Sequence, residues 1–194
     1  MSAMETLYRE HRIISAVVAC LDAATTAATK RGTVDAKSFR QCIEFFRGFA
    51  DACHHQKEEV ALFPLLEERG IPRDGGPIGV MLHEHDLGRG YLQAMDQNLA
   101  GAERREADAC QRLFAAARGY SHLLTEHIDK ENEVLFPMAD QILSAADQTR
   151  LAAEFAVDGS SGCTGQCHHR QLDVARELCQ RWNVPFPLEA TPVR

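Results

Sequence analysis

The segment HHQKEEVALFP at residues 54–64 returns as HIDKENEVLFP at residues 127–137, and this repeat decides the fold. Each copy holds a histidine and, four residues later, a glutamate, followed by leucine, phenylalanine and proline at the same offset. Residues four apart lie on one face of an α-helix, so each segment presents an imidazole stacked with a carboxylate. The repeat therefore predicts two equivalent helices whose inner faces carry potential metal ligands.

A Glu-His dipeptide precedes each copy and completes the repeat. These dipeptides are Glu10-His11 and Glu84-His85, and each lies at nearly the same distance before its H-x-x-x-E segment. The chain is thus predicted to be a duplicated helix pair, in which each pair donates one lone histidine and one H-x-x-x-E. Side chains that converge from four helices can hold two metal ions. The predicted ligands are His11, His54, Glu58, His85, His127 and Glu131.

Both glutamates of the repeat lie on helix faces that are otherwise apolar. An unpaired carboxylate buried there would cost several kcal/mol or take up a proton, and a pair of metal ions offsets that cost at both positions. The competing interpretation is a solvated helix face on which histidine and glutamate meet by chance. A single H-x-x-x-E would not separate the two interpretations, but its duplication with the same flanking residues favours the metal site.

The composition is that of an ordinary globular protein. The chain has 194 residues, of which 45% are hydrophobic and 25% charged, enough to bury one sizeable core. A net charge of -7 argues against nucleic acid as a partner. No apolar run approaches the roughly 20 residues of a membrane span, and no signal peptide is recognisable. Seven dispersed cysteines, an odd number, cannot all pair within one chain and predict a reducing, cytoplasmic location.

Helical periodicity extends over most of the chain. We expect kinks at Pro64 and Pro137, because proline interrupts the helical hydrogen bonds, and breaks at the glycine-containing segments 31–33, 71–77 and 100–101. The helices of the bundle are expected over about residues 3–30, 35–70, 78–99 and 104–143. The predicted fold class is all-α, with a four-helix bundle at residues 1–143 and a short helical extension and tail at residues 144–194.

The extension is expected to begin with a capping box at Ser144–Asp147, which opens a short helix. A glycine- and serine-rich linker at residues 158–162 then leads to an amphipathic helix over residues 166–182. The proline-containing tail at residues 183–194 is expected to lie extended.

These motifs resemble those of the hemerythrin-like family of HHE cation-binding domains, whose members carry H…HxxxE…H…HxxxE. The similarity covers about residues 3–143 and includes REH at residues 9–11 and HEHDLGR at residues 83–89. It implies an up-down-up-down four-helix bundle that holds two non-haem iron ions joined by an oxo or hydroxo group. In that arrangement Glu58 and Glu131 would bridge the irons.

Two departures distinguish this chain from the oxygen carriers of that family. Met81 stands four residues before His85, where the carriers have another histidine, and the fourth helix has H-x-x-x-E in place of H-x-x-x-x-D. The chain looks more like bacterial members with four histidines and two glutamates. That resemblance implies binding of, or reaction with, oxygen, peroxide or nitric oxide in oxidative or nitrosative stress or in iron homeostasis.

The resemblance leaves a second class of function open. The alternative is a non-enzymatic module that binds, stores or senses iron or oxygen, and the sequence does not decide whether the protein is an enzyme. The expected partners are a small oxidant or gas ligand and an unidentified electron donor, with neither nucleic acid nor membrane.

Other polar residues near the repeat are given structural interpretations. His55 follows the first ligand of its segment by one position, about 100° around an α-helix, and is expected at the surface or just outside the site. His83, Glu59 and Glu133 are expected to face solvent. His122 lies five residues before His127 and could act as a ligand in its place, but that interpretation would abolish the duplication and is set aside.

Two tyrosines and a methionine lie toward the faces that carry the ligands. Tyr8 and Tyr120 are interpreted as core residues, with the alternative that a phenol hydrogen-bonds to or ligates the metal. Met81 is expected to form a wall of the pocket.

The cysteines are treated in two groups. Cys20, Cys42, Cys53 and Cys110 fall within helices and are interpreted as small buried hydrophobic residues. Near the C-terminus, a set of soft ligands can be reduced surface thiols, a redox-active pair or a metal site. We expect this set to be dispensable for the iron site; its members are Cys163, Cys167, His168 and His169.

Overall fold

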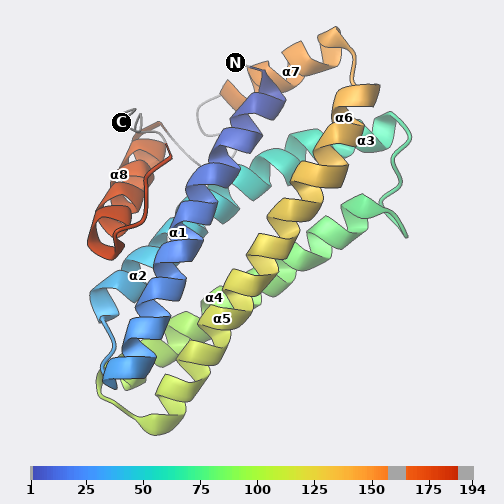
Figure 1. Cartoon of the computed structure of the whole chain (residues 1–194). Helices are drawn as coiled ribbons and strands as arrows, with labels where there is room; N and C mark the ends of the chain where they lie inside the picture. Colours follow the sequence, from blue (N-terminus) through green and yellow to red (C-terminus); the bar gives the residue numbers. More distant parts are fainter. Residues whose placement is uncertain (1, 157–164, 188–194) are drawn as a thin grey trace.

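The computed structural model describes residues 2–156 and 165–187, and every regular element within them is a helix (Figure 1). The elements labelled η are π-helical segments that interrupt longer helices. In chain order they are α1 (Ala3–Arg31), α2 (Ala36–Phe45), η1 (Phe46–His55), η2 (Glu58–Leu62), α3 (Phe63–Glu68), α4 (Pro77–Glu103), α5 (Ala107–Lys130), η3 (Glu131–Leu135), α6 (Phe136–Ile142), α7 (Ala145–Ala156) and α8 (Gly165–Trp182).

The bundle has four long helical rods that run alternately up and down (Figure 1). The first rod is α1, and the second runs from α2 through η1 and η2 to α3. The third rod is α4, and the fourth runs from α5 through η3 to α6. This arrangement confirms the all-α bundle predicted from the duplicated motif.

The glycines that end two of the rods are where the sequence predicted them. Gly32 caps α1 with φ +67°, and Gly70 follows α3 with φ +94°. Both adopt the left-handed conformation that glycine reaches without steric cost.

The break predicted at Ala100–Gly101 was wrong, because α4 continues to Glu103. Gly101 instead allows two helices to approach closely. A Cβ atom at this position would lie 2.7 Å from the Cβ of Ala109 in α5. The reversal comes later, near Arg105, which has a positive φ of 64°.

The π-helical segments were not predicted. A π-turn closes i→i+5 hydrogen bonds and so holds more residues than an α-turn. Pro64 and Pro137 each lie in the first turn of the α-helix that follows η2 or η3. The wider turn comes directly before each proline, where the missing N–H and the bulky ring would disturb a regular α-helix.

A polar layer divides the core of the bundle into two apolar clusters. The larger cluster fills one side of the layer and includes Ile14, Phe46, Leu92 and Leu124. The smaller cluster fills the other side and includes Leu7, Leu62, Met81 and Phe136. The predicted ligands lie between the two clusters.

The extension packs back onto the bundle. Ser144 and Asp147 form the predicted capping box at the start of α7: the Ser144 hydroxyl accepts from the Asp147 N–H, and the Asp147 carboxylate accepts from the Ser144 N–H. In Figure 1, α8 lies alongside α1 and α2. It buries Leu172 and Leu178 in the larger core cluster. The domain boundary at residue 143 stays a prediction, and the linker and the end of the tail lie outside the described residues.

One helix of the described part, α1, is long and apolar enough to cross a membrane. Half of its most apolar window is buried within the bundle. A core helix of a globular protein meets the same criteria, so this is weak support for a membrane span.

Candidate metal centre

The structure brings all six predicted ligands together in the polar layer. Each is at most 2% exposed. Their donor atoms form two neighbouring groups, and within each group the atoms lie within 4.8 Å of one another. The first group is His11, His54, Glu58 and Glu131; the second is His55, Glu58, His85 and His127.

Glu58 belongs to both groups, because its two carboxylate oxygens face in different directions. Oε1 lies 3.4 Å from His54 Nε2, and Oε2 lies 3.6 Å from His85 Nε2. Glu131 also reaches both sides: its Oε2 lies 3.1 Å from His11 Nε2 and 3.4 Å from His127 Nε2. Each carboxylate therefore lies between one histidine from the first half of the repeat and one from the second half, as a bridging ligand would.

The outer nitrogens of two imidazoles contact the glutamates of the Glu-His dipeptides. Glu10 accepts from His54 Nδ1 at 2.9 Å, and Glu84 accepts from His127 Nδ1 at 3.0 Å. Each glutamate also forms an ion pair with the lysine three residues after that histidine. The dipeptide thus has two roles, since its histidine enters the cluster while its glutamate orients a histidine on another helix.

The other two imidazoles are held by the residue that follows Glu58 or Glu131. His11 Nδ1 contacts Asn132 Oδ1 at 2.7 Å, and His85 Nδ1 contacts Glu59 Oε1 at 2.7 Å. Arg89 pairs with Glu59 at 2.6 Å. Glu59 was expected to face solvent, and that interpretation was wrong. With a proton held at Nδ1, each ring directs the Nε2 lone pair inward, as metal-bound histidines do.

The inward atoms lack hydrogen-bond partners in the protein. This applies to His11 Nε2, His54 Nε2 and both oxygens of Glu58 and Glu131. Buried polar atoms are normally hydrogen-bonded, so this set calls for another partner. Imidazole nitrogens and carboxylate oxygens suit iron and similar transition metals. The residues therefore fit a metal pair.

The electrostatics of the cluster agree with metal binding. Burial raises the pKa of Glu58 well above its usual range, and the nearby charge of Glu131 raises it further. Burial also lowers the pKa of His54 well below 6.5, which keeps the imidazole neutral and able to donate its lone pair. By contrast, the nearby charge of His127 outweighs burial and lowers the pKa of Glu131 to about 2, and Glu131 in turn raises the pKa of His127. Without an ion, the layer therefore keeps one carboxylate charged and disfavours a second beside it.

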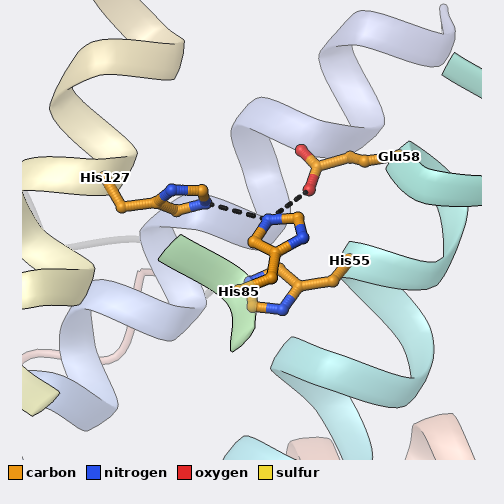
Figure 2. A group of neighbouring side chains, drawn as sticks. All are labelled: His55, Glu58, His85 and His127. Atoms are coloured by element: carbon orange, nitrogen blue, oxygen red, sulfur yellow. Dashed lines mark hydrogen bonds and ion pairs between the residues drawn. The ribbon is translucent and has the colours of Figure 1, made fainter. Parts of the chain in front are cut away.

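His55 was expected at the surface or just outside the site, and the structure contradicts the first of these alternatives. It is buried, with 6% exposure, and its ring stacks on His85 with 3.7 Å between centroids and 11° between planes (Figure 2). His55 ends η1, where the π-helix turns through less than 100° per residue. The side chains of adjacent residues therefore point in more similar directions than in an α-helix, and both His54 and His55 face the interior.

The remaining candidates match their predicted positions more closely. His83, His122 and Glu133 are exposed. Tyr120 is buried in the core against Phe46, with 4.7 Å between centroids.

Tyr8 and Met81 lie on the other side of the polar layer. Tyr8 packs edge-on against Phe136, which in turn stacks on His11 at 5.1 Å. Met81 is buried in the smaller apolar cluster. Both residues therefore support the ligands by packing.

A small cavity borders the second group. Its volume is about 10 Å³, close to the minimum for one water molecule. Three imidazoles form one side of it, those of His55, His85 and His127. The apolar side comprises Gly88, Leu92, Leu123, Leu124 and the ring of Tyr120. A diatomic molecule is of similar size.

The cysteines divide differently from the prediction. Cys20 and Cys42 are buried thiols, as expected, and burial raises the pKa of Cys42. Cys53, which directly precedes His54, is disulfide-bonded, so its interpretation as a simple hydrophobic residue was wrong. The side chains of Cys163 and Cys167 lie outside the described residues.

The C-terminal histidines are outside the two groups of ligands. His168, at the start of α8, packs against Phe49 at 5.2 Å between centroids. His169 is exposed.

Comparison with known proteins gives a family match and several relatives. The model of the hemerythrin HHE cation binding domain matches residues 2–139. The chain is 38% identical over 89 residues to the iron-sulfur cluster repair protein YtfE of Musicola paradisiaca (strain Ech703). It is 40% identical over 89 residues to that of Edwardsiella ictaluri (strain 93-146). Each alignment covers 44% of this chain and 40% of the relative. No solved structure matches the chain.

Proposed function

The chain belongs to the hemerythrin HHE cation-binding family, and from this premise we propose that it is a non-haem di-iron protein that binds or reacts with a small oxidant. The proposed ligands are the six residues predicted from the repeat: His11, His54, Glu58, His85, His127 and Glu131. Oxygen, peroxide and nitric oxide are the candidate small molecules.

The position of Glu58 is the observation that carries the proposal. This side chain is fully buried, and its two oxygens approach imidazoles of two different groups at 3.4 and 3.6 Å. A carboxylate in this position, without a hydrogen-bond donor, is stabilised if each oxygen binds a cation. Two ions therefore explain its burial better than one.

A bound pair of iron ions would supply redox chemistry and a coordination position for a small ligand. The protein's part is to hold each of the four Nε2 atoms inward through an oxygen behind the ring. Its two apolar clusters exclude bulk water from both sides of the layer. The cavity at His85 and His127 admits a molecule of diatomic size.

The names of the relatives support a role in stress. The YtfE proteins are iron-sulfur cluster repair proteins, and the alignments cover less than half of each of them. We therefore do not propose cluster repair as the activity of this chain. We propose only the physiological context, which is oxidative or nitrosative stress or iron homeostasis. The alternative function is non-enzymatic storage or sensing of iron or oxygen.

Metal analysis tests the di-iron proposal. Protein produced in iron-supplied cells should contain about two irons per chain, as expected for a bundle with paired carboxylates. Replacing Glu58 or Glu131 with alanine should remove at least one iron. Glu133→Ala is the matched control, because Glu133 is exposed and only two residues from a proposed bridge. Retention of both irons in Glu58→Ala and Glu131→Ala would refute the proposal.

Optical spectroscopy separates the two classes of function. The iron-loaded protein should be reduced without oxygen and then mixed with oxygen, peroxide or nitric oxide in a stopped-flow instrument. Rapid spectral change with consumption of the added molecule indicates reaction. Iron that loads and unloads without consuming any of the three favours storage.

A further inference from the structure

We propose that His55 is a fifth imidazole ligand of the metal centre, bound to the ion held by Glu58, His85 and His127. The two ions would then differ, one having three histidine ligands and the other two. This inference rests on the proposed function, since it requires two bound ions.

The first argument is the unmet bonding capacity of the His55 ring. The side chain is buried, and neither ring nitrogen has a hydrogen-bond partner. The nearest carboxylate oxygen, Oδ1 of Asp51, lies 3.5 Å from Nδ1. Nδ1 thus has at most this long contact, while Nε2 has no partner at all; a buried imidazole nitrogen without a partner is costly, and a metal ion would bind it.

The second argument is the position of that ring. A donor atom of His55 lies within 4.8 Å of donor atoms of Glu58, His85 and His127. Figure 2 shows the His55 ring stacked beneath the His85 ring, with His127 beside His85. Asp51, which pairs with Arg89, faces Nδ1, so Nε2 is the candidate donor.

The third argument comes from the internal repeat. The residue that corresponds to His55 in the second copy is Ile128, which is also buried, with 4% exposure. Ile128, in the regular helix α5, packs in the larger apolar cluster, whereas His55, at the end of η1, lies in the second group of ligands. A buried polar residue in one copy and an apolar one in the other indicates a difference between the two metal positions, since packing alone is satisfied by isoleucine.

The extra imidazole also accounts for Met81. That residue stands one turn before His85 in α4 and is buried in the smaller apolar cluster, so α4 supplies a single ligand. His55 approaches the same ion from η1 on a different helix. One ion thereby gains a third nitrogen without a second histidine on α4.

Variants at His55 can separate ligation from packing. His55→Phe keeps an aromatic ring over His85 but removes both nitrogens. His55→Ile introduces the residue that follows the histidine in the second copy, and so removes both nitrogens while keeping a branched apolar side chain. His83→Phe is the control, because His83 is exposed on α4. Circular dichroism and thermal melting of each variant establish that it folds.

The measurement is an anaerobic titration of the metal-free full-length protein with cobalt(II), followed by visible absorption and x-ray absorption. The wild type and His83→Phe should bind two ions. In His55→Phe and His55→Ile one of the two should bind about 10–100-fold more weakly, the range for disrupted metal-site residues. The number of imidazoles per cobalt should also fall, a change that a purely structural role would not produce.

The outcomes distinguish this inference from the proposed function. If the wild type binds two ions and both folded His55 variants match it in affinity and imidazole number, His55 is not a ligand, while the di-iron proposal stands. If the affinity falls but the imidazole number does not, His55 is a positioning residue and the inference is wrong. If the wild type binds fewer than two ions, both proposals are wrong.

Discussion

Replacing Glu10 and Glu84 with alanine, one at a time, should weaken metal binding equally but destabilise the fold unequally. Both carboxylates hold an outer imidazole nitrogen, at 2.9 and 3.0 Å. Their lysine partners differ in exposure: the side chain of Lys57 is 9% exposed, whereas that of Lys130 is 41% exposed. The repeat therefore provides two copies of one interaction in different environments.

The magnitudes follow from what each substitution leaves behind. Glu10→Ala leaves the Lys57 ammonium buried and unpaired, and breaking a buried pair in this way costs about 3–5 kcal/mol. Glu84→Ala leaves Lys130 in contact with water, and an exposed pair contributes about 0–1 kcal/mol. The free energies of unfolding should thus differ by at least about 2 kcal/mol. Metal affinity should fall by about 10–100-fold in both variants, because each loses one orienting carboxylate.

Urea unfolding of the metal-free proteins measures the stabilities, and anaerobic cobalt(II) titration measures the affinities. The double variant Glu10→Ala, Lys57→Met should recover stability relative to Glu10→Ala, because it removes the stranded charge. It should not recover metal affinity, since His54 remains without its acceptor. Equal destabilisation by Glu10→Ala and Glu84→Ala, or no recovery in the double variant, would refute this reasoning.

Three further predictions concern the metal, pH and the cavity. Removing the metal should lower the melting temperature, because Glu58 and Glu131 then face each other in the dry layer; equal melting temperatures would contradict a buried site. Burial lowers the pKa values of His54 and His55 well below 6.5. Their neutral rings therefore contribute to the free energy of unfolding of the metal-free protein above pH 6.5, and this contribution is lost as the pH falls below 6.5. The raised pKa values of Glu58 and His127 act in the opposite direction, so the test compares the wild type with His55→Phe: urea unfolding between pH 6.5 and 5 should show an extra loss in the wild type of up to about 1.4 kcal/mol per pH unit, and equal slopes in the two proteins would contradict this. Gly88→Ala should place a methyl group 3.6 Å from the Tyr120 ring, reduce the cavity and slow binding of nitric oxide without changing the metal content; an unchanged rate would exclude the cavity as the ligand site.

The sequence predicted the helices and six of the site residues because both follow from regular periodicity. His54 and Glu58 are four residues apart, and a helix turn places them together whatever the rest of the chain does. Because the motif is duplicated, the same argument predicted His127 and Glu131. The glycines at positions 32 and 70 also act locally, through a positive φ that other residues rarely adopt.

The misplaced residues depend on features that periodicity does not contain. His55 faces inward because η1 is a π-helix, and an angle of 100° per residue does not apply there. Glu59 reaches His85 because α4 packs beside η2, a tertiary contact between two copies of the repeat. Glycine is common at helix ends, but Gly101 lies inside α4 and allows α4 and α5 to approach closely. A comparison of the two copies could have drawn attention to His55, since Ile128 is its counterpart.

The charge arrangement of the site gives a reason for a bridging anion. Three of the four imidazoles are held by outer carboxylates, and each of these carboxylates pairs with a lysine or arginine. The fourth is held by the neutral amide of Asn132. The two lysine pairs are electrically balanced, whereas Arg89 is shared by Glu59, Asp51 and Asp86. Among the inward-facing ligand atoms, the negative charge comes from Glu58 and Glu131. Two divalent ions would exceed the charge of two carboxylates, and in a layer closed by two apolar clusters that excess is expensive. If two ions are bound as proposed, a small anion such as hydroxide or oxide would offset that excess, and this is the physical basis for the predicted oxo or hydroxo group.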